Sequence, residues 1–211
     1  MVRLAFNKTP QTSAETLSVI QSSFKKGSEF FQKKKLSFSF LKEGLPLGSL
    51  MEVCGPAGAG KTEVVLKFLS EHPELRVAWI EENLSIYPTA FEQNKVSLQR
   101  VLFVETSRYL WAVLQILKSQ AFGIVVLSAS ISNRHSDLLD EIERRRIQIA
   151  AEKASASVIV IDESTTSQGS WPFTVQLYVT RCRTTGRVHL QVLRYRGARQ
   201  WEKALPIANG I

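Results

Sequence analysis

One eight-residue segment constrains this chain more than any other part of its sequence. Residues 55–62 read Gly-Pro-Ala-Gly-Ala-Gly-Lys-Thr and match the pattern G-x-x-x-x-G-K-[ST] at every position. The apolar residues 50–54 predict a strand before the motif, and residues 61–70 predict a helix with an apolar face after it. In that setting, glycines let backbone N–H groups surround a phosphate at the positive end of the helix. The sequence therefore predicts a phosphate-binding loop between a buried strand and a helix.

Two side chains of this loop have predicted roles in holding a nucleotide. Lys61 is expected to reach the β- and γ-phosphates, and the Thr62 hydroxyl is expected to bind Mg²⁺. The chain is therefore expected to bind ATP or ADP together with Mg²⁺. The candidate binding residues are Gly55, Pro56, Ala57, Gly58, Ala59, Gly60, Lys61 and Thr62.

Short apolar strands alternate with helical segments along the rest of the chain. Strands are predicted at residues 50–54, 76–80, 101–104, 123–127 and 157–161, and helices at 61–70, 107–120 and 136–153. This alternation is typical of βαβ units around a mainly parallel sheet. Residues 175–181 and 188–195 alternate with period two and predict an antiparallel hairpin after the parallel strands.

The third helix is expected to begin at Ser136 and to carry an apolar stripe of Leu138, Ile142 and Ile149. Before the core, residues 16–24 predict a helix, and residues 36–40 alternate with period two. The alternating segment predicts a short strand or extended arm that packs on its own core or on a neighbouring subunit. The expected organisation is an N-terminal helix and basic arm (1–43), a core (44–200) and a C-terminal tail (201–211).

The net charge of +8 is concentrated at the two ends of the 211-residue chain. Residues 1–50 carry 8 Lys and Arg against 3 Asp and Glu, and residues 181–211 carry 7 against 1. Basic ends favour an anionic partner, so Lys33, Lys34 and Lys35 are candidate nucleic-acid contacts; a solvated basic face is the competing interpretation. With no membrane-length apolar run, no apolar leader and only two cysteines, a cytoplasmic location without a membrane partner is expected.

The segment that leads into the loop resembles the start of a RecA-type core. Residues 43–56 contain Gly-Leu-Pro before the strand and Gly-Pro at the entrance to the loop. The similarity covers about residues 40–200, and continues at 78–80, 87–88, 101–102 and 124–128. Within the RecA-like proteins, the chain is most similar to the ImuA family, which are accessory proteins of bacterial damage-induced mutagenesis. The segment 122–127 and the compact length favour this family over full recombinases.

This resemblance implies an α/β fold: a RecA-like P-loop NTPase core with a mainly parallel sheet, an N-terminal helical arm and a C-terminal antiparallel hairpin. It implies a nucleotide-binding accessory role in the DNA damage (SOS) response and translesion synthesis. The implied partners are RecA and a Y-family-like polymerase subunit, with DNA as a further candidate ligand.

The catalytic acids of RecA proteins have no clear counterparts in this chain. RecA proteins place the catalytic Glu two residues after the acid that ends the second core strand, and these positions are Glu81 and Asn83 here. The Mg²⁺-site acid corresponds to Ser128, which follows the apolar strand 123–127. An amide and a hydroxyl carry no charge, so weak or absent ATP hydrolysis is expected. Glu81 and Glu82 are the candidate replacements.

Asp162 and Glu163 also end an apolar strand, and they are a less favoured alternative for the metal site. Two other functions remain open. An active DNA-dependent ATPase of the recombinase type needs Glu81, Glu82 or Asp162 to replace the missing acids. A small P-loop kinase needs an acceptor pocket and a lid, which the sequence does not indicate.

The resemblance also suggests a site shared between subunits. RecA filaments use two basic residues at i and i+2 near the end of the core to reach the neighbour's phosphates, and Arg194 and Arg196 have that spacing. A homo-oligomer with ATP at its interface is therefore a candidate assembly, against the alternative of an exposed basic hairpin face. Tyr87 or Phe91 is expected to stack on adenine or to pack in the core.

Overall fold

The computed structural model describes residues 34–128, 139–163 and 172–196. The chain divides into two compact units, residues 1–34 and 35–211. The predicted helix at 16–24, the tail at 201–211 and Lys33 lie outside the described residues.

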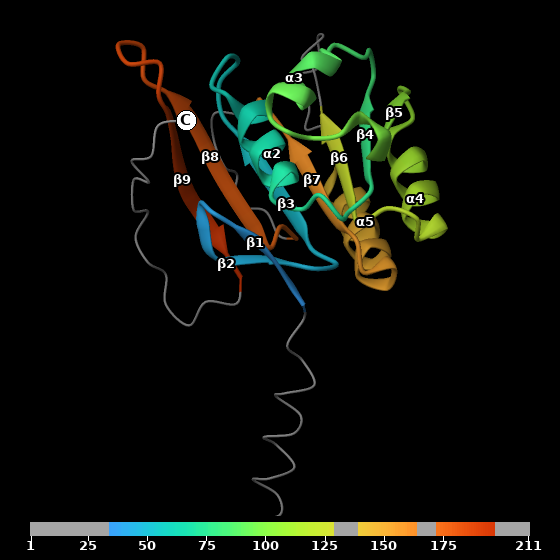
Figure 1. Ribbon diagram of the computed structural model, residues 1–211. Helices are drawn as coiled ribbons and strands as arrows, with labels where there is room; N and C mark the ends of the chain where they lie inside the picture. The colour runs from blue at the N-terminus through green and yellow to red at the C-terminus, as the bar shows by residue number, and fades with distance from the viewer. Residues whose placement is uncertain (1–33, 129–138, 164–171, 197–211) are drawn as a thin grey trace, which may run out of the picture. The chain divides into compact units, whose positions relative to one another are not determined.

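Seven strands form one sheet in the order β5-β4-β6-β7-β3-β8-β9 (Figure 1). All neighbouring strands are parallel except β8 and β9, which form the antiparallel hairpin. The predicted α/β class, the mainly parallel sheet and the terminal hairpin are therefore confirmed. The strands are β3 (Leu50–Cys54), β4 (Val77–Glu81), β5 (Val101–Glu105), β6 (Ile124–Ser128), β7 (Ser157–Ile161), β8 (Val175–Arg181) and β9 (Val188–Tyr195).

Helices cover the two faces of this sheet. The chain passes from β3 to β4 and on to β5 in one direction. It then returns through β6 and β7, which lie between β4 and β3, and continues in β8 and β9 on the other side of β3. Because parallel crossovers are right-handed, this reversal puts the outgoing and returning helices on opposite faces. One face packs on α2 (Lys61–Ser70) and α3 (Pro88–Gln93), and the other on α4 (Tyr109–Ser119) and α5 (Glu141–Ala154) (Figure 1).

A separate antiparallel pair, β1 (Lys35–Phe38) and β2 (Leu41–Pro46), packs on the α2 side. The Phe38 ring meets the Phe68 ring of α2 edge to face at 5.0 Å, and the Ser39 N–H donates to the Glu71 carboxylate at 2.9 Å. Of the two expectations for this segment, packing on its own core is the one observed. Because β1 and β2 are part of the core, the compact unit begins at Lys35, earlier than the expected boundary after residue 43.

The position of α2 is fixed by Arg100, in the 3₁₀ turn η1 (Leu98–Arg100) before β5. Its guanidinium donates to the carbonyls of Leu69 at 2.6 Å, His72 at 2.9 Å and Leu75 at 2.6 Å. These carbonyls lie at and just after the carboxyl end of α2, where backbone acceptors lack helical partners. Burial lowers the pKa of Arg100, against a smaller opposing effect of Glu74. One half-buried cation therefore secures the helix that begins at the glycine loop.

The predicted apolar stripe of α5 is wrong. Ile142 and Ile149 are 72% and 40% exposed, and the buried face carries Arg144, Ile147 and Ala151 instead. Arg144 extends this face because its Nε donates to the Leu139 carbonyl at 2.9 Å and its guanidinium lies over the Phe173 ring. The helix begins at Glu141 rather than near residue 136, because Asp140 caps it in a reciprocal capping box with Glu143. Ser136 and Leu138 lie outside the described residues.

Other predicted strand and helix boundaries shift by one or two residues, and the strand predicted at 36–40 ends at Phe38. The shift at β6 matters for the site, because Ser128 is the last residue of the strand rather than the first residue after it. Within the described ranges, no helix has the length and hydrophobicity needed to cross a membrane.

Candidate functional site

The loop at residues 55–60 uses positive-φ glycines at three positions with different surroundings. Gly55 has φ 145°, and a Cβ there would lie 2.2 Å from the Val179 carbonyl oxygen of β8. Gly58 has φ 74°, and a Cβ there would meet no atom within 4 Å. Side chains are strained at such φ values, so both positions favour glycine. Of these two, only Gly55 is also required by a close approach to backbone, that of β8.

The third glycine, Gly60, is the N-cap of α2, with φ 96°. No side chain caps this helix end. The first N–H groups of a helix have no partners within the helix, and the helix dipole adds positive potential there. The start of α2 is therefore available to an anion that lies against the loop.

Lys61 is the first residue of α2, and its side chain is buried over the loop. Its Nζ donates to the carbonyls of Gly55 at 2.8 Å and Pro56 at 2.9 Å. Burial lowers the pKa of Lys61, and the nearby carboxylates of Glu163 and Asp162 partly offset this effect. A phosphate group beside Nζ would compensate the charge that the loop carbonyls now solvate.

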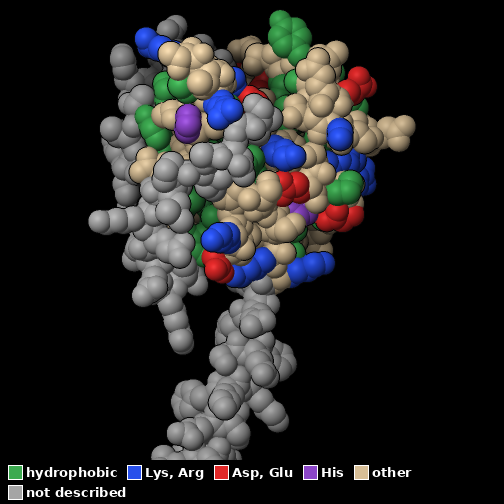
Figure 2. Space-filling model, turned by 60° about the vertical axis from the view of Figure 1, so that its left-hand side comes forward, with side chains coloured by type: hydrophobic (Ala, Val, Ile, Leu, Met, Phe, Trp, Pro, Cys, Tyr) green, Lys and Arg blue, Asp and Glu red, His purple; other side chains and the backbone are tan. Residues whose placement is uncertain are grey.

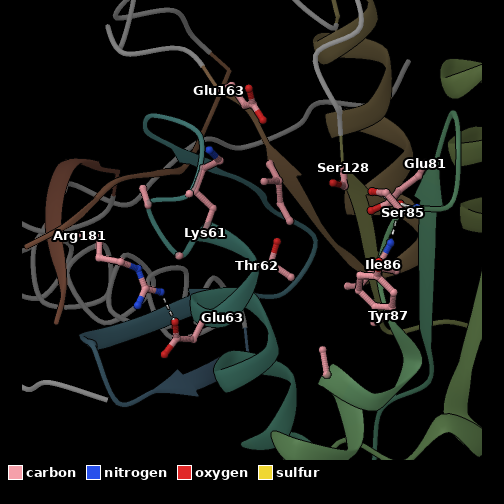
Figure 3. A pocket seen from close by; sticks show the side chains of 15 residues that line it. Lys61, Thr62, Glu63, Glu81, Ser85, Ile86, Tyr87, Ser128, Glu163 and Arg181 are labelled. Carbon is pink, nitrogen blue, oxygen red and sulfur yellow. Dashed lines mark hydrogen bonds and ion pairs between the residues drawn. The ribbon is translucent and has the colours of Figure 1, made fainter. Parts of the chain in front are cut away.

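A cavity of about 500 Å³ opens over the loop and the start of α2 (Figure 3). It is bounded by residues at or near the carboxyl ends of β4, β6, β7 and β8 and by the segment that enters α3. Crevices at the carboxyl ends of parallel strands are the usual ligand sites of such sheets. The lining residues are Gly58, Ala59, Gly60, Lys61, Thr62, Glu63, Glu81, Ser85, Ile86, Tyr87, Ala90, Ser128, Ile161, Glu163 and Arg181.

Glu81 lines the cavity, but neighbouring donors hold its carboxylate. Oε1 accepts from Trp79 Nε1 at 2.9 Å, and Oε2 accepts from the Ser85 N–H at 2.7 Å. Oε2 also accepts from the Ser85 hydroxyl at 3.2 Å and the Ile86 N–H at 3.4 Å. The side chain is 3% exposed. This arrangement fixes the loop after β4, and it leaves the carboxylate little freedom to orient a water molecule.

The other two positions predicted around the end of β4 do not line the cavity. Glu82 contacts the opposite side of the sheet, where its carboxylate accepts from the Tyr109 hydroxyl of α4 at 3.4 Å. Asn83 is exposed and is not among the lining residues. Consecutive side chains along a strand point to opposite faces, which accounts for the divergence of Glu81 and Glu82.

Ser128 and Glu163 lie on the wall formed by β6 and β7. Ser128 supplies a hydroxyl where the resemblance places a metal-site acid. Glu163 lies two residues after β7 and lines the same cavity as Lys61 and Thr62 (Figure 3). A threonine hydroxyl and a carboxylate are oxygen donors of the kind that Mg²⁺ prefers. Thr62 and Glu163 therefore have the donor chemistry to hold a Mg²⁺ ion together with phosphate oxygens.

Arg181, at the end of β8, is a cavity residue that sequence reasoning did not single out for this site. Its Nη2 lies 2.6 Å from Glu63 Oε2 in the first turn of α2 (Figure 3). Its Nη1 donates to the Gly186 carbonyl at 2.9 Å. Its place in the sequence, at the end of a predicted strand, was the signal that could have identified it as a cavity residue. Arg181 ends a strand that runs parallel to the strand before the loop, so it reaches the same edge of the sheet.

The two aromatic candidates have different surroundings. Phe91 is fully buried and makes edge-to-face contacts with Trp79 and Phe103. Tyr87 is 78% exposed and lines the cavity. Of the two, only Tyr87 is accessible to a base.

Arg194 and Arg196 lie at the far end of the sheet from the loop. β9 runs antiparallel to β8, so Arg194 pairs with Gln176, and the Arg196 N–H donates to the Thr174 carbonyl at the start of β8. Neither arginine lines the cavity of its own chain. A role at phosphates in a neighbouring subunit stays a prediction.

The basic arm enters the described residues at Lys34, which is exposed. Lys35 is half-exposed and forms an ion pair with Glu43 at 3.3 Å. On the face shown in Figure 2, Lys and Arg side chains lie in several separate places, with Asp and Glu near some of them. Neither the Lys35 ion pair nor the face in view adds support for nucleic-acid binding by this arm.

No protein-family model matches the sequence, and a search of curated proteins finds no significant similarity.

Proposed function

We propose that the chain binds a nucleoside triphosphate or diphosphate with Mg²⁺ in the cavity over residues 55–62. The observation that carries the proposal is that three features able to bind an anion lie around one cavity. Positive-φ glycines, a helix start without a side-chain cap and a buried lysine all border the same cavity of about 500 Å³. Each supplies positive potential or N–H donors to an anion.

The proposed fold is that of a RecA-like P-loop NTPase core. The order of the strands, with the loop after an inner strand and an antiparallel hairpin at the edge, supports this proposal. The proposed biological role is that of an ImuA-like accessory protein in DNA damage-induced mutagenesis, acting in the cytoplasm. RecA and a Y-family-like polymerase subunit are the proposed partners, and this part rests on the sequence resemblance alone.

Hydrolysis is proposed to be weak. An attacking water needs a base to orient it, and Mg²⁺ needs an acid near the phosphates. Glu81 is held by Trp79, Ser85 and Ile86, and Ser128 carries no charge. Binding needs neither residue, because the loop and Lys61 supply the phosphate contacts.

An active DNA-dependent ATPase is the second candidate, and Glu163 is the observation that favours it. Three carboxylates line the cavity within the described residues: Glu63, which pairs with Arg181, Glu81, which is held by four donors, and Glu163. Glu163 is thus better placed than Glu82 or Asn83 to replace a missing acid.

Binding is tested with a fluorescent ADP analogue and Mg²⁺, using Lys61→Ala against the matched control Lys67→Ala. Lys67 lies on the same helix but does not line the cavity. We expect Lys61→Ala to weaken binding at least tenfold and Lys67→Ala to leave it within about twofold. Equal binding by the two variants would refute the proposed site.

Hydrolysis is tested by phosphate release with and without single-stranded DNA. Release by the wild type no faster than by Lys61→Ala supports the accessory role. DNA-stimulated release that Glu163→Gln abolishes, and Glu82→Gln does not, supports the ATPase.

A further inference from the structure

The ion pair between Arg181 and Glu63 lies at the rim of the cavity. Arg181 Nη2 and Glu63 Oε2 are 2.6 Å apart, and their side chains are 39% and 29% exposed. An ion pair that is partly exposed to water restrains its partners only weakly. A ligand with more negative charge than one carboxylate is therefore able to displace it.

The guanidinium of Arg181 is close to the start of α2. A Cβ built on Gly60 would lie 2.9 Å from Arg181 Nη2 and 3.4 Å from Glu63 Oε2. The pair therefore lies directly beside the loop, within the same cavity as Lys61 and Thr62 (Figure 3). The planar fork of a guanidinium fits phosphate and carboxylate oxygens in the same way, so the two anions compete for it.

Arg181 also connects the cavity to the turn of the β8–β9 hairpin, residues 182–187. Its Nη1 donates to the Gly186 carbonyl at 2.9 Å, and the Gly186 N–H donates back to the Cys182 carbonyl at 2.9 Å. Cys182 Sγ lies 3.1 Å from Thr184 Oγ1 within the same turn. Movement of the guanidinium would remove a donor from this turn.

We propose that Arg181 senses the terminal phosphate of a bound nucleoside triphosphate, exchanging Glu63 for that phosphate and altering the hairpin turn. The inference rests on the proposed nucleotide site and adds to it a residue that distinguishes triphosphate from diphosphate. Glu63 acts as the internal competitor, which holds Arg181 at the rim in the absence of the third phosphate.

The test compares the affinities for a non-hydrolysable ATP analogue and for ADP in Arg181→Ala, Glu63→Gln and Arg183→Ala. Arg183 is the matched control, because it is an exposed arginine of the same turn that does not line the cavity. Arg181→Ala should lower the affinity for the ATP analogue at least tenfold and change that for ADP by less than about threefold. Glu63→Gln should raise affinity for the ATP analogue, because it removes the competitor, and Arg183→Ala should change neither affinity.

A second measurement follows the hairpin directly, through the rate at which iodoacetamide alkylates Cys182. Cys54 is buried, so Cys182 is the accessible thiol of the described residues. The rate should change at least twofold with the ATP analogue but not with ADP, and this difference should vanish in Arg181→Ala.

The outcomes separate this inference from the proposed function. If Arg181→Ala and Glu63→Gln weaken both nucleotides equally, the pair is a structural clamp and the sensor is refuted, while the nucleotide site stands. If the wild type binds no nucleotide more tightly than Lys61→Ala does, both proposals fail.

Discussion

Two glycines of the loop should respond very differently to the same added methyl group. In Gly58→Ala the new Cβ meets nothing within 4 Å, so the cost is the left-handed backbone, about 1–2 kcal/mol. The reduced freedom of the unfolded chain offsets about 0.4–1 kcal/mol of this. We therefore expect Gly58→Ala to lower the free energy of unfolding by about 1 kcal/mol.

In Gly55→Ala the Cβ would lie 2.2 Å from the Val179 carbonyl oxygen, which is backbone and has no rotamer to change. The loop or β8 must move by about 1 Å to restore contact distance, which adds about 1–3 kcal/mol of overpacking to about 1–3 kcal/mol of backbone strain. A total near 4 kcal/mol is expected. For a domain of this size it corresponds to a fall in Tm of about 8–16 °C, against about 2–4 °C for Gly58→Ala.

The assay is thermal and urea unfolding of both variants, together with nucleotide binding by any variant that folds. Gly58→Ala should fold yet bind nucleotide at least tenfold more weakly, since its methyl group occupies space that the phosphates need. If both variants lower Tm equally, the close approach of Gly55 to β8 is not a stabilising constraint. If Gly58→Ala binds as the wild type does, the open side of that glycine does not face the ligand.

Three further predictions follow from the described contacts. Arg100→Met should lower the free energy of unfolding by about 3 kcal/mol in urea titrations, because three carbonyls at and just after the carboxyl end of α2 lose a charged donor. The pKa of Cys182 is lowered to about 6, first by the Thr184 hydroxyl, so its alkylation rate should rise through pH 6 and level off above pH 7; Thr184→Val should move the rise to higher pH. Mg²⁺-ATP at 100 times its wild-type Kd should stabilise the wild type by about 2.7 kcal/mol, or about 5–11 °C in Tm. At the same concentration it should stabilise Lys61→Ala, which binds at least tenfold more weakly, by no more than about 1.4 kcal/mol.

Local patterns predicted the parts of this molecule whose conformation is decided within a few residues. The loop, the strand before it and the helix after it follow from the spacing of Gly55, Gly60 and Lys61 and from the flanking apolar residues. The parallel sheet follows from the alternation of strands and helices, and its terminal hairpin from period-two segments on either side of a turn.

Periodicity did not identify which face of α5 is buried. Two sets of residues have helical spacing, one with Ile142 and Ile149 and one with Arg144, Ile147 and Ala151. Hydrophobicity favours the first set, but the second is buried because Arg144 finds a carbonyl and an aromatic ring to contact. Those partners come from elsewhere in the fold, so the helix sequence alone does not identify them.

Tertiary contacts also explain why the roles of charged residues in the candidate site were hard to predict from the sequence. Glu81 looked available for catalysis because its donors, Trp79, Ser85 and Ile86, are not recognisable as its partners from the sequence. Arg181 went unassigned to the cavity because its contact with Glu63 spans 118 positions along the chain. Sequence spacing identifies a loop whose conformation is determined by its own residues. The side of the cavity that four strand ends form depends on tertiary contacts, which the spacing does not reveal.

Phosphate binding and hydrolysis place different demands on the residues of the site. The groups predicted to bind phosphate are mostly backbone N–H groups, which depend on loop conformation and tolerate change elsewhere in the wall. Under the proposed function, the groups needed for hydrolysis are single side chains, and the residue at the end of β6, where the resemblance places a metal-site acid, is the uncharged Ser128. Under the proposed function, the chain lacks the acid and keeps the loop, so nucleotide binding would change conformation rather than drive chemistry. In the proposed sensor, Arg181, which contacts both Glu63 in the cavity and Gly186 in the hairpin turn, would provide the physical route for such a change.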